Sequence, residues 1–121
     1  MTLTTRATWL AAITALSVIF AHTPVEAASF NCRYAKTPAE NAICKDRGLS
    51  RQDERMASIY FGLQNDLSSR RARQLKRGQT DWLAERDDCG FNKSCLRRSY
   101  RNRIAEMCDI ADYEDLSCDD Y

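Results

Sequence analysis

Apolar residues recur every three or four positions over most of the chain beyond residue 37, and this spacing predicts amphipathic helices. The clearest stripe lies between residues 50 and 67. Ser50 is a suitable N-cap for this helix, and Asp53 falls in its first turn, where a negative charge suits the helix dipole. The apolar positions of the stripe are Met56, Ile59, Tyr60, Leu63 and Leu67.

A shorter helix is predicted immediately before this one. Thr37 is a good N-cap, and Pro38 suits the first turn because the N–H that proline lacks is not needed there. Glu40 completes a capping box with Thr37. We expect this helix to end near Lys45–Asp46, with Gly48 in the left-handed conformation past its end.

Two further helices are predicted, from about residue 70 to 87 and from about residue 94 to 107. The stripe of the first consists of Ala72, Leu75, Gln79, Trp82, Leu83 and the aliphatic stem of Arg86. The stripe of the second consists of Leu96, Tyr100, Ile104 and Met107. Residues 109–121 show no clear periodicity, and no alternating pattern indicates a strand. We therefore expect an all-α fold: a small bundle of about four helices over residues 28–108, followed by an irregular acidic tail.

The first part of the chain has the pattern of a secretory signal peptide. An apolar run extends from Trp9 to Ala21, and Val25-Glu26-Ala27 fits a signal-peptidase site. The run is shorter than the roughly 20 residues that a membrane span requires. We expect residues 1–27 to be removed, with cleavage after Ala28 as the alternative. The mature protein is then periplasmic or secreted and has no membrane anchor.

All six cysteines lie beyond the expected cleavage site, at positions 32, 44, 89, 95, 108 and 118. An even number of cysteines in a short exported chain indicates a disulfide framework, which a domain of this size needs to supplement a modest core. Six cysteines allow many pairings, and their spacing favours local ones. These are Cys32 with Cys44 across the first helix, Cys89 with Cys95 around a short loop, and Cys108 with Cys118 at the tail.

The remaining composition argues against catalysis and metal binding. The only histidine, His22, lies in the expected signal peptide, and there is no Cys-x-x-Cys motif. A zinc site or a histidine-dependent nucleophile is therefore not expected. The carboxylates of the third helix alternate with arginines at ordinary salt-bridge spacing, which is typical of a charged surface rather than of a glycosidase pair. We expect no catalytic residue, no metal and no cofactor.

Charge is unevenly distributed, although the net charge is only +1. Residues 70–103 contain eleven Lys and Arg against four Asp and Glu, whereas residues 104–121 contain seven acidic residues and no basic one. Either the acidic end folds over the basic helices, or the two segments form separate partner surfaces. The basic stretch 70–77 lacks interleaved aromatic residues, so a solvated helix face is favoured over nucleic-acid binding.

Residues 32–104 also carry an ordered set of motifs. The set consists of Cys32, Thr37-Pro38, Glu40, Ala42-Ile43-Cys44, Leu49, Asp53, Tyr60, Gln79-x-x-Trp82-Leu83-x-x-Arg86, Cys89, Cys95-Leu96, Tyr100 and Arg103-Ile104. This pattern resembles the N-terminal domain family of the LprI-type lysozyme inhibitors, which are small exported bacterial proteins. The resemblance implies a helical domain with bridges Cys32–Cys44 and Cys89–Cys95.

The resemblance also singles out a structural motif, which comprises Gln79, Trp82, Arg86, Asp53, Tyr60 and Tyr100. Gln79 and Arg86 lie on the same helix face as Trp82, one turn away on either side. We expect them to hydrogen-bond backbone carbonyls or Asp53 across the helix pair, which is a structural role.

The function implied by the resemblance is that of a binding protein that inhibits lysozyme. The family takes its name from a lipoprotein, whereas Cys32 follows no lipid-attachment motif. This chain is also expected to lack an additional C-terminal domain and to have an extra cysteine pair around its acidic tail. Many lysozymes are strongly basic, so an acidic segment would steer their association. The candidate contacts are Asp109, Asp112, Glu114, Asp115, Asp119 and Asp120.

The alternative is a structural or interaction module of the cell envelope that binds another envelope protein or anionic components through the basic helical face.

Overall fold

The computed structural model describes residues 28–121, so the expected signal peptide and its cleavage site lie outside the described residues. The described part of the chain is all-α, as the sequence predicts. Its elements are η1 (Cys32–Tyr34), α1 (Pro38–Lys45), α2 (Arg47–Asp66), α3 (Ser69–Asp88), α4 (Lys93–Tyr113) and η2 (Cys118–Asp120), where η denotes a 3-10 helix. Within residues 28–121 no helix combines the length and the apolar character needed to cross a bilayer.

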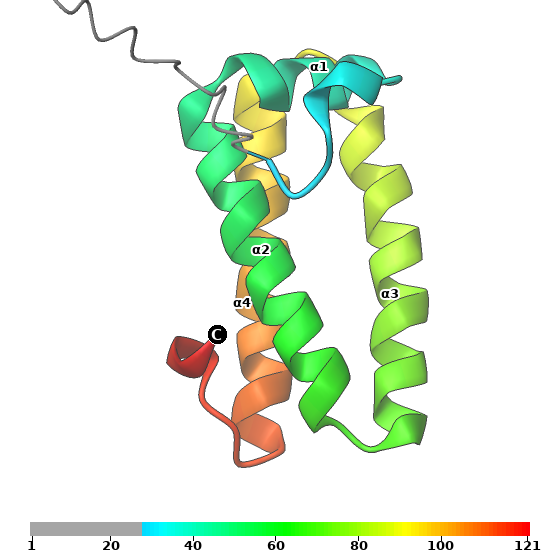
Figure 1. The fold of residues 1–121 in the computed structure, drawn as a ribbon, viewed down its shortest axis with the longest axis vertical. Helices are drawn as coiled ribbons and strands as arrows, with labels where there is room; N and C mark the ends of the chain where they lie inside the picture. Colours follow the sequence, from blue (N-terminus) through cyan, green and yellow to red (C-terminus); the bar gives the residue numbers. More distant parts are fainter. Residues whose placement is uncertain (1–27) are drawn as a thin grey trace, which may run out of the picture.

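The three long helices run along the length of the molecule, and the short α1 lies across one end of them (Figure 1). The most extensive packing is between α2 and α4, and α1 contacts both α2 and α3. The segment after α4 turns back at the opposite end, so that η2 lies beside α4. The domain thus has one end closed by α1 and another end formed by the C-terminal residues.

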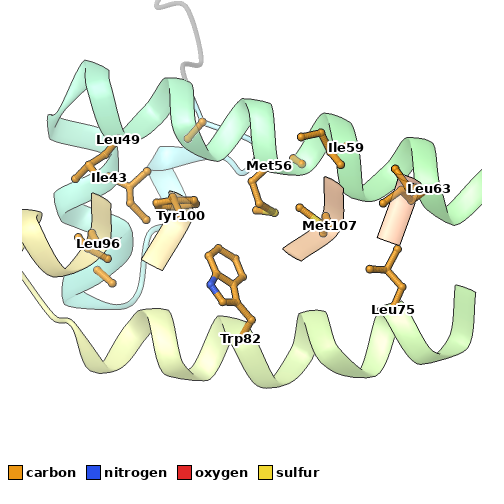
Figure 2. Close-up of a cluster of buried hydrophobic side chains, with 14 of the residues drawn as sticks. Ile43, Leu49, Met56, Ile59, Leu63, Leu75, Trp82, Leu96, Tyr100 and Met107 are labelled. Atoms are coloured by element: carbon orange, nitrogen blue, oxygen red, sulfur yellow. The ribbon is translucent and has the colours of Figure 1, made fainter. Parts of the chain in front are cut away.

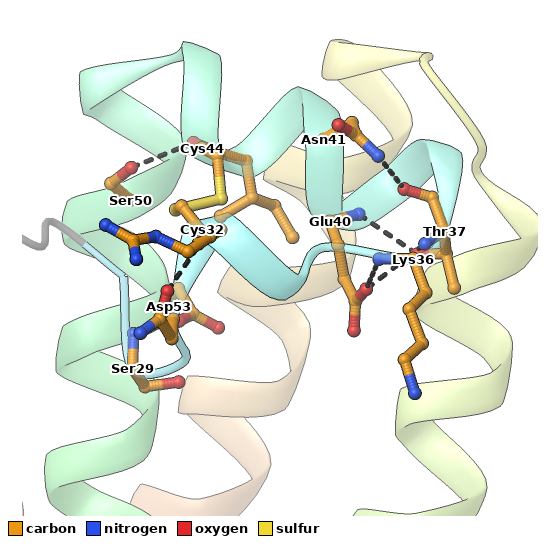
Figure 3. The surroundings of a disulfide bond; sticks show 12 residues. Ser29, Cys32, Lys36, Thr37, Glu40, Asn41, Cys44, Ser50 and Asp53 are labelled. Carbon is orange, nitrogen blue, oxygen red and sulfur yellow. Dashed lines mark hydrogen bonds between the residues drawn. A yellow bond between two sulfur atoms is a disulfide. The ribbon is translucent and has the colours of Figure 1, made fainter.

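The capping box at the start of α1 is confirmed. The Glu40 N–H donates to the Thr37 hydroxyl at 3.1 Å, and the Glu40 carboxylate accepts the Thr37 N–H at 3.1 Å (Figure 3). The same carboxylate accepts the Lys36 N–H at 2.6 Å. This bond, followed by the one from Thr37, lowers the pKa of Glu40, so the cap is charged at neutral pH.

α1 ends at Lys45 as expected, whereas the expected start of α2 is wrong. α2 begins at Arg47 rather than after Ser50, because Asp46 caps it by accepting the N–H groups of Gly48 and Leu49 at 3.0 and 3.1 Å. Gly48 therefore lies in the first turn of α2 and not in a left-handed position. Ser50 is buried inside the helix, where its hydroxyl donates to the Ile43 carbonyl at 2.8 Å.

Asp46 also connects this junction to α4. Its carboxylate lies 2.9 Å from the Arg97 guanidinium and 3.1 Å from the Lys93 ammonium. The pKa of Asp46 is lowered, first by the Leu49 N–H and next by the hydrogen bond from Lys93. One carboxylate therefore caps a helix and joins α4 to it.

The apolar stripes of α2, α3 and α4 meet in one core, whose central residues are shown in Figure 2. Leu83 is an exception, because its side chain is 38% exposed although the periodicity places it on the stripe. It lies about 100° around the helix from Trp82, whose indole occupies the core-facing position. The fully buried large side chains are Ile43, Leu49, Ile59, Leu63, Leu96, Tyr100 and Met107.

α4 is longer than its sequence pattern suggests and extends to Tyr113, so the first five residues of the acidic segment are helical. The extension keeps Ala111 buried one turn after Met107. The helix ends in a Schellman motif: the Leu116 N–H donates to the Ala111 carbonyl at 2.9 Å, and the Asp115 N–H to the Asp112 carbonyl at 3.3 Å. Asp115 has a φ of 57°, in the left-handed region where glycine is usual.

The last residues fold back onto α2. The Arg55 guanidinium donates to the carbonyls of Tyr121 and Cys118 at 2.5 and 3.0 Å, and the Tyr121 hydroxyl donates to Asp66 at 2.8 Å. A Cβ atom at Gly62 would lie 2.0 Å from the Tyr121 ring, so only glycine permits this close contact. Burial against α2, and then the Asp66 carboxylate, raise the pKa of Tyr121 to about 12.

Three disulfides join the cysteines in the local pairs that the spacing favours: Cys32–Cys44, Cys89–Cys95 and Cys108–Cys118. The first ties the N-terminal segment across α1 (Figure 3). The second closes the turn between α3 and α4, and the third holds the C-terminal segment to α4. Each bridge therefore fixes a segment that the apolar core alone holds weakly.

We predict that replacing Cys108 and Cys118 together by alanine lowers the free energy of unfolding by about 2–3 kcal/mol, because the unfolded chain is no longer closed into a loop. The helices should remain, since the core lies elsewhere. Urea denaturation followed by circular dichroism measures both quantities. An unchanged unfolding midpoint would show that this bridge does not stabilise the domain.

Candidate functional site

Three of the motif residues predicted from the sequence, Trp82, Arg86 and Tyr100, lie around the buried carboxylate of a fourth, Asp53. Asp53 is fully buried in the second turn of α2 and not, as expected, in the first turn. Its Oδ2 accepts the Ser29 N–H at 2.6 Å (Figure 3), and its Oδ1 accepts the Tyr100 hydroxyl at 2.8 Å. The carboxylate thus holds the N-terminal segment and α4 against α2.

Arg86 provides the positive charge for this cluster. Its Nη1 lies 4.0 Å from Asp53 Oδ1 and 3.5 Å from the Tyr100 hydroxyl. Its Nη2 and Nε donate to Asp87 at 2.6 and 2.9 Å. The expected approach of Arg86 to Asp53 is present, while its shortest hydrogen bonds are made to Asp87.

Trp82 packs the apolar side of the same cluster. Its ring meets the Tyr100 ring edge-on with centroids 5.3 Å apart, and the Arg86 guanidinium lies 5.7 Å from the indole centroid. The indole N–H donates to the Ser99 hydroxyl at 3.0 Å. Burial, and next the Asp53 charge, raise the pKa of Tyr100 far above its usual value of 10.0. The phenol therefore remains a hydrogen-bond donor to Asp53.

Gln79 does not join the Asp53 cluster. Its Nε2 lies 3.1 Å from the Met56 sulfur, and its Oε1 accepts the Arg103 Nε–H at 3.0 Å. Tyr60, the sixth motif residue, is half-buried and packs on the Phe61 ring with centroids 5.1 Å apart. The structure therefore brings three motif residues together around Asp53. Gln79 instead contacts a second arginine, Arg103, and Tyr60 contacts neither group.

A hollow of about 370 Å³ lies beside Tyr60, between α2, α3 and the N-terminal segment. Phe30, Tyr60, Phe61 and Leu83 line its walls, while Asp53 and Arg86 contribute to its floor. The carboxylate of Asp53 and the guanidinium of Arg86 already have partners within the domain.

The candidate partner contacts form two groups. Asp109, Asp112, Glu114 and Asp115 surround the C-terminal end of α4, while Asp119 and Asp120 lie on η2. Glu114 is half-buried and pairs with Arg71 of α3 at 2.9 Å. The Asp119 side chain is 98% exposed and lies 3.7 Å from Arg55. Neutralisation within the domain is thus confined to a few pairs, and most of these carboxylates face solvent.

An aromatic residue that the sequence reasoning missed lies among these carboxylates. Tyr113 is 74% exposed, and the Arg71 guanidinium lies 5.2 Å from its ring centroid. The arginine that pairs with Glu114 therefore also supports the ring. The available signal is an aromatic residue within the acidic segment, at a position that the sequence pattern places in an irregular tail. We call the surface formed by Glu106, Asp109, Asp112, Tyr113, Glu114 and Asp115 the acidic face.

Comparisons with known proteins agree with the motif pattern. The family model described as "Lysozyme inhibitor LprI" matches residues 31–108. Proteins named "Lipoprotein LprI" from Mycobacterium bovis (strain ATCC BAA-935 / AF2122/97) and from the CDC 1551 / Oshkosh and ATCC 25618 / H37Rv strains of Mycobacterium tuberculosis are each 29% identical over 92 residues. The alignment covers 74% of this chain and 45% of each relative, so the chain matches less than half of their length. No solved structure matches the chain significantly.

The Tyr100–Asp53 bond predicts a specific dependence of stability on pH. The folded state keeps the Tyr100 phenol protonated, whereas in the unfolded chain it ionises near pH 10. The unfolded state therefore binds fewer protons above pH 10, and stability falls as the pH rises. Tyr100→Phe should remove up to about 1.4 kcal/mol of this loss per pH unit. At neutral pH it should destabilise the domain by about 1–3 kcal/mol, because Asp53 loses a partner.

Urea unfolding at pH 7, 10 and 11 measures both effects. Tyr34→Phe is the control, since the Tyr34 ring is 68% exposed. If the free energy of unfolding fell equally steeply with pH in Tyr100→Phe and in the native protein between pH 10 and 11, the phenol would not be held neutral by burial.

Proposed function

Because this chain belongs to the LprI lysozyme inhibitor family, we propose that it is an exported binding protein that inhibits lysozyme-type enzymes. The family match over residues 31–108 is the observation that carries the proposal. The relatives are named lipoproteins, and the leader pattern of this chain supports release into the periplasm or the medium rather than lipid anchoring. The match ends at residue 108, so a contact made by the residues after it is proposed for this chain and is not carried over from the family.

The acidic face is the surface that we propose for this contact. Its carboxylates would attract a strongly basic enzyme over several ångströms and raise the rate of encounter. Tyr113 adds a large, amphipathic side chain that Arg71 holds in place, and aromatic residues of this kind often dominate binding energy. The proposed mechanism is obstruction of the enzyme by a bound domain, with no chemical step.

The interior contacts of the domain and its third disulfide support this role. Asp53, Arg86 and Tyr100 satisfy one another in the interior, and the Cys108–Cys118 bridge lies directly beside the acidic face. A surface that is already ordered loses less entropy on binding.

A second candidate function is supported by the positively charged surface of α3. Arg70, Arg73, Lys76 and Arg77 are exposed on α3, and none has a carboxylate within 4.0 Å among the described residues. This basic helix face favours an anionic envelope component, and the protein would then be an interaction module of the envelope. The two candidates place the partner on different surfaces.

We predict that the exported, fully oxidised protein inhibits cell-wall lysis by a c-type lysozyme at micromolar concentration or below. A turbidity assay with titrated protein and isothermal calorimetry of the pair measure inhibition and affinity. Absence of both at micromolar excess would reject lysozyme as the target.

Neutralising the acidic face should weaken this binding. We expect Asp109→Asn combined with Asp112→Asn to raise the Kd roughly threefold to tenfold at low ionic strength, and the difference should shrink as salt screens it. The matched control is Asp81→Asn combined with Glu85→Gln on the exposed side of α3, which removes the same charge elsewhere. If the control pair weakens binding equally, only net charge matters and the proposed surface is wrong.

Asp115 offers a test that separates binding from folding. Glycine suits a φ of 57° better than aspartate does, so Asp115→Gly should raise the free energy of unfolding by up to about 1 kcal/mol. The same change removes a carboxylate from the acidic face and should raise the Kd for lysozyme. Thermal unfolding and calorimetry on one sample measure both. A more stable variant with unchanged affinity would exclude Asp115 from the contact.

A further inference from the structure

Arg103 has a hydrogen-bonding group that the domain does not use. Its side chain is 2% exposed; Nε donates to Gln79 at 3.0 Å, and Nη1 donates to Glu106 at 2.8 Å. Nη2 is buried and has no acceptor among the described residues. A buried N–H of a charged group without a partner costs free energy, which an incoming acceptor would recover.

A pocket of about 140 Å³ adjoins this group between α3 and α4. Arg103 itself lines it, together with Gly78, and the apolar side chains of Leu67, Leu75 and Ile110 form walls. The space is close to that of a cavity that admits a molecule as small as benzene, so it holds only a small group. It therefore suits the tip of a group that carries an acceptor on a short apolar stem.

We propose that this pocket binds the carbonyl oxygen of a neutral amide group, which accepts a hydrogen bond from Arg103 Nη2. A guanidinium only donates, so the bound atom must be an acceptor. The positive charge of Arg103 is already matched by Glu106, and that of Arg71 at the pocket wall by Glu114. An anion would add a further negative charge beside these carboxylates, so a neutral carbonyl is favoured.

The position of the pocket indicates where the amide comes from. Arg71, Glu106 and Ile110 line both this pocket and the hollow that contains Asp109, Tyr113 and Glu114 of the acidic face. A protein docked on the acidic face would therefore reach the pocket with an Asn or Gln side chain or an exposed backbone carbonyl. The identity of that protein as a lysozyme rests on the proposed function, whereas the amide specificity of the pocket does not.

Gly78 keeps a side chain of α3 away from the guanidinium of Arg103. Glycine in the middle of α3 is unfavourable for the helix. A Cβ atom at this position would lie 3.6 and 3.7 Å from the two terminal nitrogens of Arg103, which is ordinary contact. Alanine would thus fit and favour the helix, but it would cover the guanidinium edge. A larger side chain would occupy the pocket.

The first experiment titrates the isotope-labelled oxidised protein with acetamide and follows the Arg103 Nε–H resonance by nuclear magnetic resonance. We expect a saturable shift with a Kd of roughly tens of millimolar, as suits a ligand of very few atoms. Gly78→Met should abolish it, and acetate should bind more weakly than acetamide. A shift that does not saturate, or that survives in Gly78→Met, overturns the site, and stronger binding of acetate overturns the neutral specificity.

The second experiment compares folding with partner affinity. Gly78→Ala should raise the Tm by about 4 °C and raise the Kd for lysozyme about tenfold, because one hydrogen bond to a charged group is lost. Ser58→Ala, at an exposed position of α2, is the matched control and should leave the Kd unchanged. Unchanged affinity in Gly78→Ala overturns the role of the pocket in docking. Failure of the native protein to bind lysozyme would reject the proposed function, and the acetamide titration would still decide the pocket.

Discussion

The buried carboxylate of Asp53 is the constraint on which the packing of this domain depends. A charge in the interior is tolerated only when it is paired and hydrogen-bonded, because removal from water is costly. Asp53 meets this condition with groups from three separate parts of the chain: the Ser29 N–H, the Tyr100 hydroxyl and the Arg86 guanidinium. Helices in any other register would leave the carboxylate without these partners, so the cluster specifies one arrangement of α2, α3 and α4.

The disulfides act where this cluster and the apolar core do not reach. The core follows the contact between α2 and α4, while the ends of the domain are a short helix, a tight turn and a C-terminal segment with few buried residues. Each bridge crosses one of these regions. Oxidation therefore completes a fold whose centre is specified by polar pairing, and disulfides of this kind are typical of small domains with a modest core.

The helical class, the three local disulfides and most core positions could be predicted because periodicity and cysteine spacing are local signals. Boundaries were harder where two local signals competed: Asp46 proved a better cap than Ser50, and burial of Ala111 extended α4 past Met107. The partners of Gln79 could not be predicted, because Arg103 and Met56 lie on other helices and are far from Gln79 in the sequence. Tyr113 was missed because its role depends on Arg71, a residue far away in the sequence.

Three departures from local rules lie on the side of the molecule formed by α3 and the C-terminal half of α4. Gly78 lies inside a helix that alanine would favour, Arg103 keeps a buried N–H without an acceptor, and Asp115 occupies a glycine-type conformation. Around Asp53, by contrast, each charged group has a partner. Residues that lower the stability of their own helix or leave a polar group unsatisfied are expected at sites selected for function. Their location beside the acidic face therefore favours this side of the bundle, rather than the Asp53 cluster, as the surface that meets a partner.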